Sequence, residues 1–410
     1  MNAPSTRRAL LVLLVVSGVI ISLSMGLRQS MGLFMRPVTL DLGISAAAFS
    51  FSLALQNIVW GLTQPFVGAA ADRYGARPVA LVTALVYAGG FLIMMAAKNE
   101  YVFHAAGFLL GLGVAGTGLG VMLGVVARAT PPEKRSQRVG LVAATGSLGT
   151  VLMAPIGQAF VDGLGWRAGF VFFAAVAVAM AALALLLRTE SAAPDARPAA
   201  APQRMSEALG DALRHRGFMQ MTVAYFACGF QLVFIMTHLP QYLQICGVAP
   251  SVGAQALALI GLCNTVGTYL FGHLGAHYSQ KRLLAIIYGL RTVFIAIFVL
   301  VPVTATTTLV FAAAMGFLWL GVAPLITGVV SKVFGFAHFN MLYGTVFLSH
   351  QFGSFAGAWM GGMVFSYTGS YSIAWGALLV IGAIAFTLQW TMDDTPPPQR
   401  AVAEPVPAVA

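Results

Sequence analysis

The sequence predicts an all-α membrane protein, with twelve transmembrane helices arranged as two pseudosymmetric six-helix bundles. Of the 410 residues, 59% are hydrophobic and only 8% are charged, whereas a soluble domain is about 45–50% apolar and about 25% charged. Apolar stretches recur along the chain, and glycines of the first half recur at a nearly fixed offset in the second. This composition excludes a soluble enzyme, a disordered protein, a disulfide scaffold and a nucleic-acid binder.

A helix needs about 20 apolar residues to cross a bilayer. Twelve stretches meet this requirement, at 9–36, 45–71, 77–97, 101–127, 137–161, 166–187, 217–245, 251–277, 281–302, 305–331, 338–364 and 370–391. The first stretch follows Arg7 and Arg8 but exceeds the apolar region of a signal peptide, so we interpret it as a retained helix.

One long polar interruption, 189–216, divides the chain into an N-terminal bundle (1–188) and a C-terminal bundle (217–392). We expect this interruption to be a cytoplasmic linker whose end, Met205 to Arg216, forms a short amphipathic surface helix. The tail from 393 to 410 is rich in proline, alanine and valine, which predicts a disordered cytoplasmic segment.

The net charge of +10 follows from the placement of basic residues. With the N-terminus inside, seventeen of the 22 lysines and arginines fall on the cytoplasmic side: Arg7, Arg8, Arg73, Arg77, Arg128, Lys134, Arg135, Arg138, Arg188, Arg197, Arg204, Arg214, Arg216, Lys281, Arg282, Lys332 and Arg400. Excess positive charge marks cytoplasmic loops. We therefore expect a multi-pass protein of the inner (plasma) membrane with both termini in the cytoplasm, and no nucleic-acid partner.

The two halves share a glycine pattern. Five glycines recur 204 positions later: Gly124, Gly140, Gly149, Gly157 and Gly165 match Gly328, Gly344, Gly353, Gly361 and Gly369. Gly26 and Pro37 recur 203 positions on, as Gly229 and Pro240. Duplicated six-helix units are typical of transporters whose site lies between the halves near the middle of the membrane.

The segment Gly68-Ala-Ala-Ala-Asp72-Arg73-Tyr74-Gly75-Ala76-Arg77-Pro78 joins the second and third predicted helices. It resembles the GxxxDRxGxR loop signature of the major facilitator superfamily, and this resemblance covers essentially the whole chain. The resemblance implies a cytoplasmic gate formed by Gly68, Asp72, Arg73, Gly75 and Arg77. A topogenic basic loop is the alternative. The second-half copy has Ala276 where Asp72 stands.

Within this superfamily, the stretches CGFQLVFIMTHLP, IYGLR and HQFGSFAGAWMGG are similar to those of bacterial relatives of the monocarboxylate transporters. Members of that family typically carry an aspartate and an arginine four residues apart on the eighth helix. Asn264 and Thr268 stand at the best-matching positions, so the usual pair for proton and anion is absent here.

Away from the ends of the predicted spans, the membrane interior holds two arginines, Arg28 and Arg291, and no carboxylate. Arg28 sits in the first helix, and because an arginine facing lipid is costly, we expect it to face a cavity and bind an anion. Snorkelling of its side chain to the outer surface is the alternative. Arg291 lies in the middle of the ninth helix and is a further candidate for substrate binding, with a structural role as its alternative.

Four other polar residues complete the candidate site. The internal repeat pairs Gln231 with Arg28, which predicts that they line opposite walls of one cavity, and His238 lies on the same helical face as Gln231. His350 and His238 are candidates for a coupling proton, because histidine titrates near neutral pH. Asn264, like the stripe of Gln56, Asn57, Trp60 and Gln64, either binds substrate or forms hydrogen bonds between helices.

Gly353, Gly357, Gly361 and Gly362 predict close packing of the eleventh helix. The chain has no nucleotide loop, nucleophile elbow or metal motif, so we expect neither an enzyme nor a cofactor. The sequence therefore predicts a monomeric secondary transporter working by alternating access. Its expected substrate is a small organic anion, most plausibly a monocarboxylate, with or without coupled protons. Efflux of amphipathic drug-like compounds and a transporter-like sensor are the alternatives.

Overall fold

The computed structural model describes residues 3–130, 132–187, 205–334 and 339–396. The predicted linker therefore lies outside the described residues up to Arg204, and the predicted tail from residue 397 onward. The end of the linker forms a short surface helix, α9 (Met205–Arg214), close to the predicted range.

The described chain is helical, and no strand occurs in these ranges. The first half comprises α1 (Ala3–Gln29), η1 (Met31–Phe34), α2 (Met35–Leu42), α3 (Ala46–Tyr74), α4 (Ala76–Ala96), α5 (Glu100–Thr117), α6 (Leu119–Arg128), α7 (Pro132–Leu164) and α8 (Trp166–Ala184). The second half comprises α10 (Arg216–Ile245), α11 (Pro250–His277), α12 (Gln280–Leu300), α13 (Ala305–Phe317), α14 (Val322–Phe334), α15 (Phe339–Thr368) and α16 (Ser372–Trp390).

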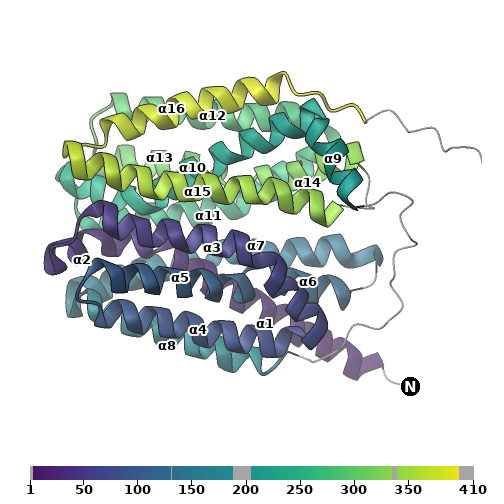
Figure 1. Ribbon diagram of the computed structural model, residues 1–410, viewed down its shortest axis with the longest axis horizontal. Coiled ribbons are helices and arrows are strands. Elements are labelled where there is room, and N and C mark those ends of the chain that lie inside the picture. The colour runs from purple at the N-terminus through teal and green to yellow at the C-terminus, as the bar shows by residue number, and fades with distance from the viewer. Residues whose placement is uncertain (1–2, 131, 188–204, 335–338, 397–410) are drawn as a thin grey trace, which may run out of the picture.

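Within the described ranges, eleven spans are long and apolar enough to cross a membrane. The remaining predicted span, 338–364, corresponds to α15, a helix of 30 residues that carries polar groups such as His350, Gln351 and Ser354 along its middle. The predicted class of two six-helix bundles is confirmed, and the helices of both bundles run roughly along one common direction (Figure 1).

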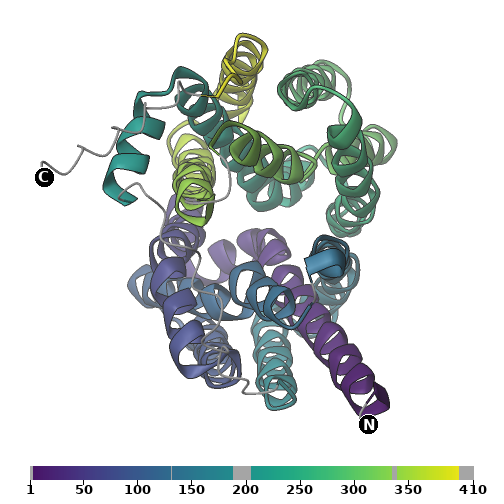
Figure 2. The same ribbon diagram turned by 90° about the vertical axis from the view of Figure 1, so that its right-hand side faces the viewer.

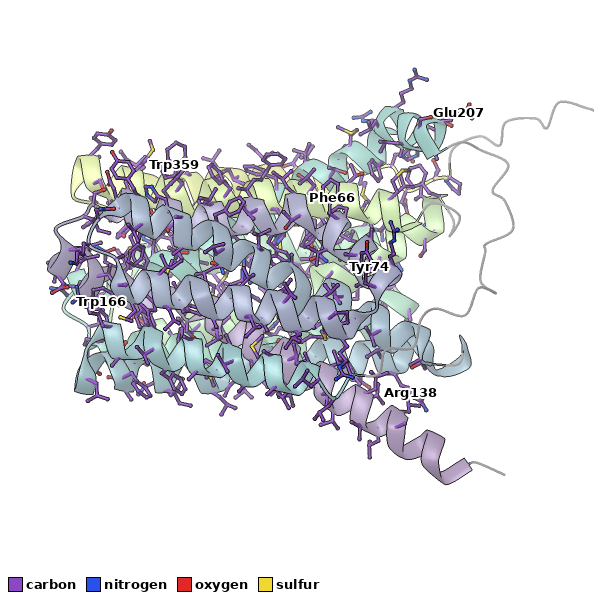
Figure 3. All side chains as sticks on the ribbon, turned by 60° about the horizontal axis from the view of Figure 1, so that its bottom comes forward. Phe66, Tyr74, Arg138, Trp166, Glu207 and Trp359 are labelled. Atoms are coloured by element: carbon purple, nitrogen blue, oxygen red, sulfur yellow. The ribbon has the colours of Figure 1, made fainter. Side chains whose placement is uncertain are left out.

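The two ends of the bundle differ in chemistry. Arg138 and Tyr74 lie at one end and Trp166 at the other (Figure 3). We call the first the basic end, because Arg73, Arg77, Arg138, Lys281, Arg282 and Lys332 are located there. The second is called the opposite end. Viewed from the basic end, the first and second halves form two separate groups of helices (Figure 2).

Close glycine contacts repeat between the halves in atomic detail. A Cβ on Gly149 of α7 would lie 1.6 Å from Ser22 O of α1, and one on Gly353 of α15 would lie 2.0 Å from Phe226 O of α10. Both positions of the second pair lie 204 residues after those of the first, although only the glycine is the same residue. Only glycine permits such approach, which lets dispersion forces act between helices in a medium without a hydrophobic driving force.

Positive backbone dihedrals repeat as well. Gly43 (φ 64°) and Gly247 (φ 80°) end corresponding helices, and so do Gly165 (φ 82°) and Gly369 (φ 68°). Each pair is separated by 204 positions, the offset found in the sequence. Glycine adopts this left-handed region without the steric cost that other residues incur. The internal repeat is therefore a repeat of backbone geometry.

Two predicted spans are interrupted where the sequence analysis expected continuous helices. The stretch 101–127 is divided at Gly118 into α5 and α6, and the stretch 305–331 is divided at Leu318–Gly321 into α13 and α14. Breaks inside a membrane free backbone groups that need other partners. At the second break, Asn264 and Arg291 form hydrogen bonds with the freed backbone groups.

The described contacts between the halves lie at the opposite end and in the middle of the bundle. The backbone N–H of Ala47 in α3 donates a hydrogen bond to Ser366 Oγ in α15 (3.1 Å). A Cβ on Gly362 of α15 would lie 1.8 Å from Ser50 Oγ of α3. Nearer the middle, a Cβ on Gly61 would lie 2.8 Å from the Gln351 side chain. Towards the basic end, α6 and α14 pack mainly against helices of their own half.

This arrangement predicts that cysteines at Ala47 and Ser366 form a disulfide under mild oxidation, in a background with Cys246 and Cys263 replaced by serine. The two backbones approach closely enough there for the short reach of a disulfide. With a protease site placed in the segment 188–204, the cleaved halves should migrate together on a gel until they are reduced. Either single-cysteine variant is the control, and halves that separate without reductant would contradict the contact.

Candidate functional site

Arg28 lies near the end of α1 and is held by two side chains of α3. Its Nη2 donates a hydrogen bond to Asn57 Oδ1, and its Cζ lies 5.1 Å from the centroid of the Trp60 ring. The side chain is partly exposed, its Nε has no hydrogen-bond partner, and no ion pair joins it to a described carboxylate. The guanidinium therefore still has a free N–H donor and a positive charge that no described carboxylate neutralises, and an anion could bind there.

Side chains of the other half contact the two α3 residues that hold this arginine. Trp60 packs edge-on against Phe347 of α15, with ring centroids 5.5 Å apart. Gln351 Nε2 donates to the backbone carbonyl of Asn57 over 3.2 Å. We call the group formed by these side chains and the adjacent histidine the Arg28 cluster: Arg28, Asn57, Trp60, Phe347, His350 and Gln351. It lies at the contact between the halves, where the sequence analysis expected a site.

His350 is buried, with an exposed fraction of 8%. Its Nδ1 lies 3.3 Å from Gln351 Oε1 and 3.4 Å from Ser354 Oγ. Its Nε2 is buried without a hydrogen-bond partner. The ring packs against Tyr225 of α10 at a centroid distance of 4.7 Å. The structure thus places this predicted candidate next to Gln351, which bonds to Asn57, the residue that binds Arg28.

Asn264 is committed to holding helices together. Its Oδ1 accepts the Leu320 N–H (2.8 Å) at the break between α13 and α14. Its Nδ2 donates to Ser147 Oγ (2.7 Å) of α7, in the other half, and Thr268 Oγ1 donates back to Asn264 Oδ1 (3.0 Å). The two positions at which family members carry an aspartate and an arginine are therefore hydrogen-bonded to each other, and this arrangement favours the interhelical alternative.

Arg291 is completely buried and binds the other side of the same break. Its Nη2 donates to Leu318 O (2.6 Å) and to Trp319 O, and its Nη1 to Cys228 Sγ (3.4 Å). These carbonyls have lost their helical partners, so the guanidinium satisfies the broken backbone. The contacts favour the structural alternative for Arg291 over substrate binding.

Gln231 does not face Arg28. Its side chain is completely buried, and its Nε2 donates to Leu378 O (3.1 Å) of α16. A Cβ on Gly382 of α16 would lie 2.6 Å from the same amide. The repeat places Gln231 at the matching position of its helix, but the side chain points to a helix of its own half, so the expected opposite wall is not formed by this residue.

Both ring nitrogens of His238 have partners. Nε2 lies 2.7 Å from Ala358 O, and Nδ1 lies 3.2 Å from Tyr371 OH. The ring is completely buried, and Gly361 packs against it. Tyr371 also donates to Gln241 Oε1 (3.0 Å), so His238 belongs to a polar network near the opposite end. It lies apart from the Arg28 cluster.

The structure adds Phe347, Tyr225, Ser147 and Gln351, which the sequence analysis did not select. Asn57 and Trp60 belong to the polar stripe for which substrate binding and interhelical hydrogen bonds were both open. Asn57, Trp60, Phe347 and Gln351 meet where α3 contacts α15 of the other half, and this depends on helix rotations that the sequence does not give. Among the described residues, no group of three or more histidine, cysteine or acidic side chains forms a metal site.

The predicted gating loop forms a tight turn at the basic end. The helix α3 ends at Tyr74, Gly75 adopts φ 90°, and α4 begins at Ala76. Arg73 and Arg77 are exposed, and the Arg73 guanidinium stacks 5.3 Å from the Tyr74 ring centroid. Gly68 has open space around its Cα, and the Asp72 side chain lies outside the described part. The gating role stays a prediction.

In the second half, the copy of this loop has no acidic residue, but Asp394, which follows the last helix, lies near it. Asp394 pairs with Lys281 at the start of α12 (2.7 Å) and with Lys332 at the end of α14 (2.6 Å). Burial opposes ionisation of this carboxyl, but the two lysines outweigh it and lower its pKa from 3.8 to about 2. Lys281 also donates to Met392 O (3.1 Å), so the segment 392–394 is docked on the bundle.

We expect Arg291→Met to destabilise the protein strongly. The substitution removes the donors to Leu318 O and Trp319 O, and a buried carbonyl without a donor costs about 1–3 kcal/mol. Thermal unfolding in detergent measures the change in midpoint. The matched control is Arg282→Met on the exposed side of the same helix, which should unfold at the wild-type temperature. Equal midpoints for all three proteins would show that Arg291 does not support the break.

Asp394→Asn should lower stability in a pH-dependent manner. The pKa of Asp394 is depressed in the folded state, so its ion pairs stabilise the protein fully above about pH 4 and lose this effect as the pH falls towards 2. The difference in unfolding midpoint between wild type and variant should therefore be largest at pH 5–6 and shrink at lower pH. Because the lysines are partly exposed, high salt should also reduce it. A difference independent of pH would argue against the ion pairs.

Comparisons with known proteins agree with this architecture. A rat protein named monocarboxylate transporter 13 is 26% identical over 368 residues, covering 88% of this chain and 84% of its own. The oxalate:formate antiporter of Oxalobacter formigenes is 22% identical and covers 90% of this chain and 87% of its own. A crystal structure of a bacterial homologue of the human lysosomal transporter Spinster has a TM-score of 0.77 at 16% identity, covering 97% of this chain and 100% of that one.

These proteins are transporters, and none is an enzyme. The family model described as Major Facilitator Superfamily matches residues 11–358, which is most of the sequence. Together with the two helical bundles, this match establishes that the chain is a membrane transporter and belongs to the Major Facilitator Superfamily.

Proposed function

We propose that the protein is a secondary transporter that moves a small organic anion, a monocarboxylate, by alternating access. The carboxylate of the substrate binds to Arg28. Both termini lie in the cytoplasm, and the basic end faces that side of the inner (plasma) membrane, as the distribution of lysine and arginine favours. With its contacts between the halves at the opposite end, the described state is the one that opens towards the cytoplasm.

The observation that carries this proposal is the unneutralised charge of Arg28. A charge within a membrane protein is costly unless it is paired, and such residues mark pathways for substrates and ions. No carboxylate of the spans pairs with this one, and Asn57 and Trp60 hold its guanidinium beside the other half. A carboxylate from solution supplies the missing partner and completes a charge-assisted hydrogen bond.

The names of the relatives support an organic acid as the substrate. One refers to monocarboxylates, one to oxalate and formate, and a third, NanX of Escherichia coli, to sialic acid. These sequences are 22–26% identical to this chain. A site built around one guanidinium, rather than two, favours a single carboxylate.

The position of the Arg28 cluster supports alternating access at this site. Its members come from α1 and α3 of one half and α15 of the other. When the halves rock about such a contact, a bound anion is exposed first to one side of the membrane and then to the other. Arg291 and Asn264 hold the break of the tenth span and keep its shape during this motion.

Arg28→Gln should strongly reduce carboxylate transport while leaving folding intact. The substitution keeps a polar side chain but removes the charge, and loss of one charge-assisted hydrogen bond of about 1.5–3 kcal/mol corresponds to roughly 10- to 150-fold lower transport efficiency. The measurement is uptake of labelled lactate, formate and oxalate into proteoliposomes loaded with the same unlabelled compound.

Arg282→Gln, an exposed arginine at the basic end, is the matched control and should transport like wild type. Two results would contradict the proposal. If wild type moves none of the three compounds, the substrate class is wrong and efflux of amphipathic compounds becomes the alternative. If Arg28→Gln transports as well as wild type, Arg28 does not bind the substrate.

A further inference from the structure

An open cavity of about 400 Å³ lies at the basic end of the second half, and we call it the basic-end cavity. Its walls come from the end of α11 and the start of α12 on one side and from the end of α14 on the other. None of its described lining residues is acidic. Those with hydroxyl, amide or ammonium groups are Tyr278, Ser279, Gln280, Ser331 and Lys332. A cavity lined by such donors and by no described carboxylate is suited to an anion.

Two lysines at this cavity already hold an anionic group of the chain itself. Lys281 Nζ lies 2.7 Å from Asp394 Oδ1, and Lys332 Nζ lies 2.6 Å from Asp394 Oδ2. Each carboxylate oxygen thus contacts one ammonium group, so the two ammonium groups are spaced to bind one oxyanion together. Lys332 lines the cavity, and its side chain is 55% exposed, so its ammonium group can reach an anion there.

The internal repeat explains why this part of the second half takes its anion from elsewhere. Lys332 matches Arg128 at the offset of 204 positions, but Ala276 stands where the first half has Asp72. The second half thus keeps the basic residue and lacks the acid of the loop. Asp394 comes from a separate segment, and ion pairs of partly exposed lysines contribute little net stability. A more highly charged anion can therefore replace this carboxylate.

The start of α12 adds further donors beside the lysines. Ser279 precedes the first turn of this helix, and its side chain forms no capping hydrogen bond. The first N–H groups of a helix have no partner within the helix, and phosphate groups bind readily at such ends. Ser279 and Gln280 both line the cavity, so this end of α12 faces it. The helix thereby adds to the positive potential that the two lysines create.

An exposed apolar stripe on α12 leads away from the cavity. Its members are spaced three or four residues apart and are 41% to 51% exposed: Ile286, Leu290, Val293 and Ile297. Ser279 precedes Ile286 by seven residues, or two turns, and so lies on the same side of the helix. In a membrane-spanning helix such a stripe contacts acyl chains. A ligand with a phosphate group and acyl chains therefore fits better than a soluble anion, and basic pockets between transmembrane helices bind lipid head groups in this way.

We propose that the basic-end cavity binds the phosphate group of an anionic phospholipid, with Lys281 and Lys332 as its charged partners and its acyl chains along the α12 stripe. The phosphate takes the place of the Asp394 carboxylate, so the lipid and Asp394 compete for the two lysines. In the proposed orientation this lipid belongs to the cytoplasmic leaflet. No residue of the Arg28 cluster takes part, so the inference goes beyond the transport proposal and is tested independently of it.

Native mass spectrometry of the purified full-length protein measures the binding of phosphatidylglycerol and of phosphatidylcholine with the same acyl chains. Phosphatidylglycerol should bind more tightly, because the choline group neutralises the charge of its phosphate. In the double variant Lys281→Gln/Lys332→Gln, affinity for phosphatidylglycerol should fall roughly 30-fold, since each lysine near anionic lipid contributes about fivefold. The matched control is Arg214→Gln/Arg216→Gln, which removes two exposed charges at the same end and should bind like wild type.

A second variant acts in the opposite direction. Asp394→Asn keeps both lysines but removes the competing charge, so phosphatidylglycerol should bind to it roughly fivefold more tightly than to wild type. This result does not depend on the folding of the double lysine variant. Unchanged or weaker binding to Asp394→Asn overturns the proposal, because the lipid and this carboxylate then do not share a site.

The remaining outcomes are equally decisive. Equal affinity for the two lipids, or unchanged phosphatidylglycerol binding in the double lysine variant, overturns the site. Inorganic phosphate and glycerol 3-phosphate serve as soluble probes and should bind much more weakly than phosphatidylglycerol. If either binds as tightly, the occupant is a soluble anion and the lipid assignment is overturned. Transport by Arg28→Gln affects none of these readings, so failure of the transport proposal is distinguishable from failure of this one.

Discussion

The structure depends on one constraint, which is that the interior of a membrane protein supplies neither water nor, in this chain, a carboxylate to satisfy polar groups. Each buried donor and each charge must therefore find its partner in the backbone or in another side chain. Arg291 finds two carbonyls freed by the break of the tenth span, and His238 finds Ala358 O and Tyr371. Arg28 retains a charge that no such group neutralises. Residues whose polar groups are all bonded therefore support the fold, whereas Arg28, with a charge left unneutralised, is the candidate for binding a ligand.

The same constraint explains the packing of the helices. Lipid tails are as apolar as the side chains, so helices associate through close contact and interhelical hydrogen bonds. Gly149 against Ser22 and Gly353 against Phe226 bring backbones together in both halves, which gives two similar rigid bundles. Polar contacts between the bundles, such as Asn264 with Ser147 and Gln351 with Asn57, then lie in the middle. Rigid units with a polar contact between them are suited to rocking motion.

Pseudosymmetry in the backbone does not extend to the roles of side chains. Gln231 stands where the repeat predicts a counterpart of Arg28, yet its amide bonds to α16 of its own half. Asn264 and Thr268 stand where relatives resembling this chain carry charges, yet they bond to each other and to the broken span. Because these residues bond within the scaffold, the polar groups of α15 nearest to the Arg28–Asn57 pair along the hydrogen bonds are Gln351, which bonds to Asn57, and its neighbour His350. A duplicated scaffold can therefore place its functional groups asymmetrically.

The sequence by itself determined the class of fold, because hydropathy, basic loops and the glycine repeat are local properties that a bilayer imposes directly on composition. It also singled out Arg28, since an arginine in an apolar stretch without any acid is unusual at the level of sequence alone. Only the tertiary structure decided that Arg291 and Asn264 hold a helix break, that His238 is fully bonded, and that His350 and Gln351 join the contact of α15 with the residues that hold Arg28. These outcomes depend on how each helix is rotated and where it is interrupted, and both are set by contacts between residues of different helices, from 27 positions apart for Arg291 and Leu318 to 294 for Asn57 and Gln351.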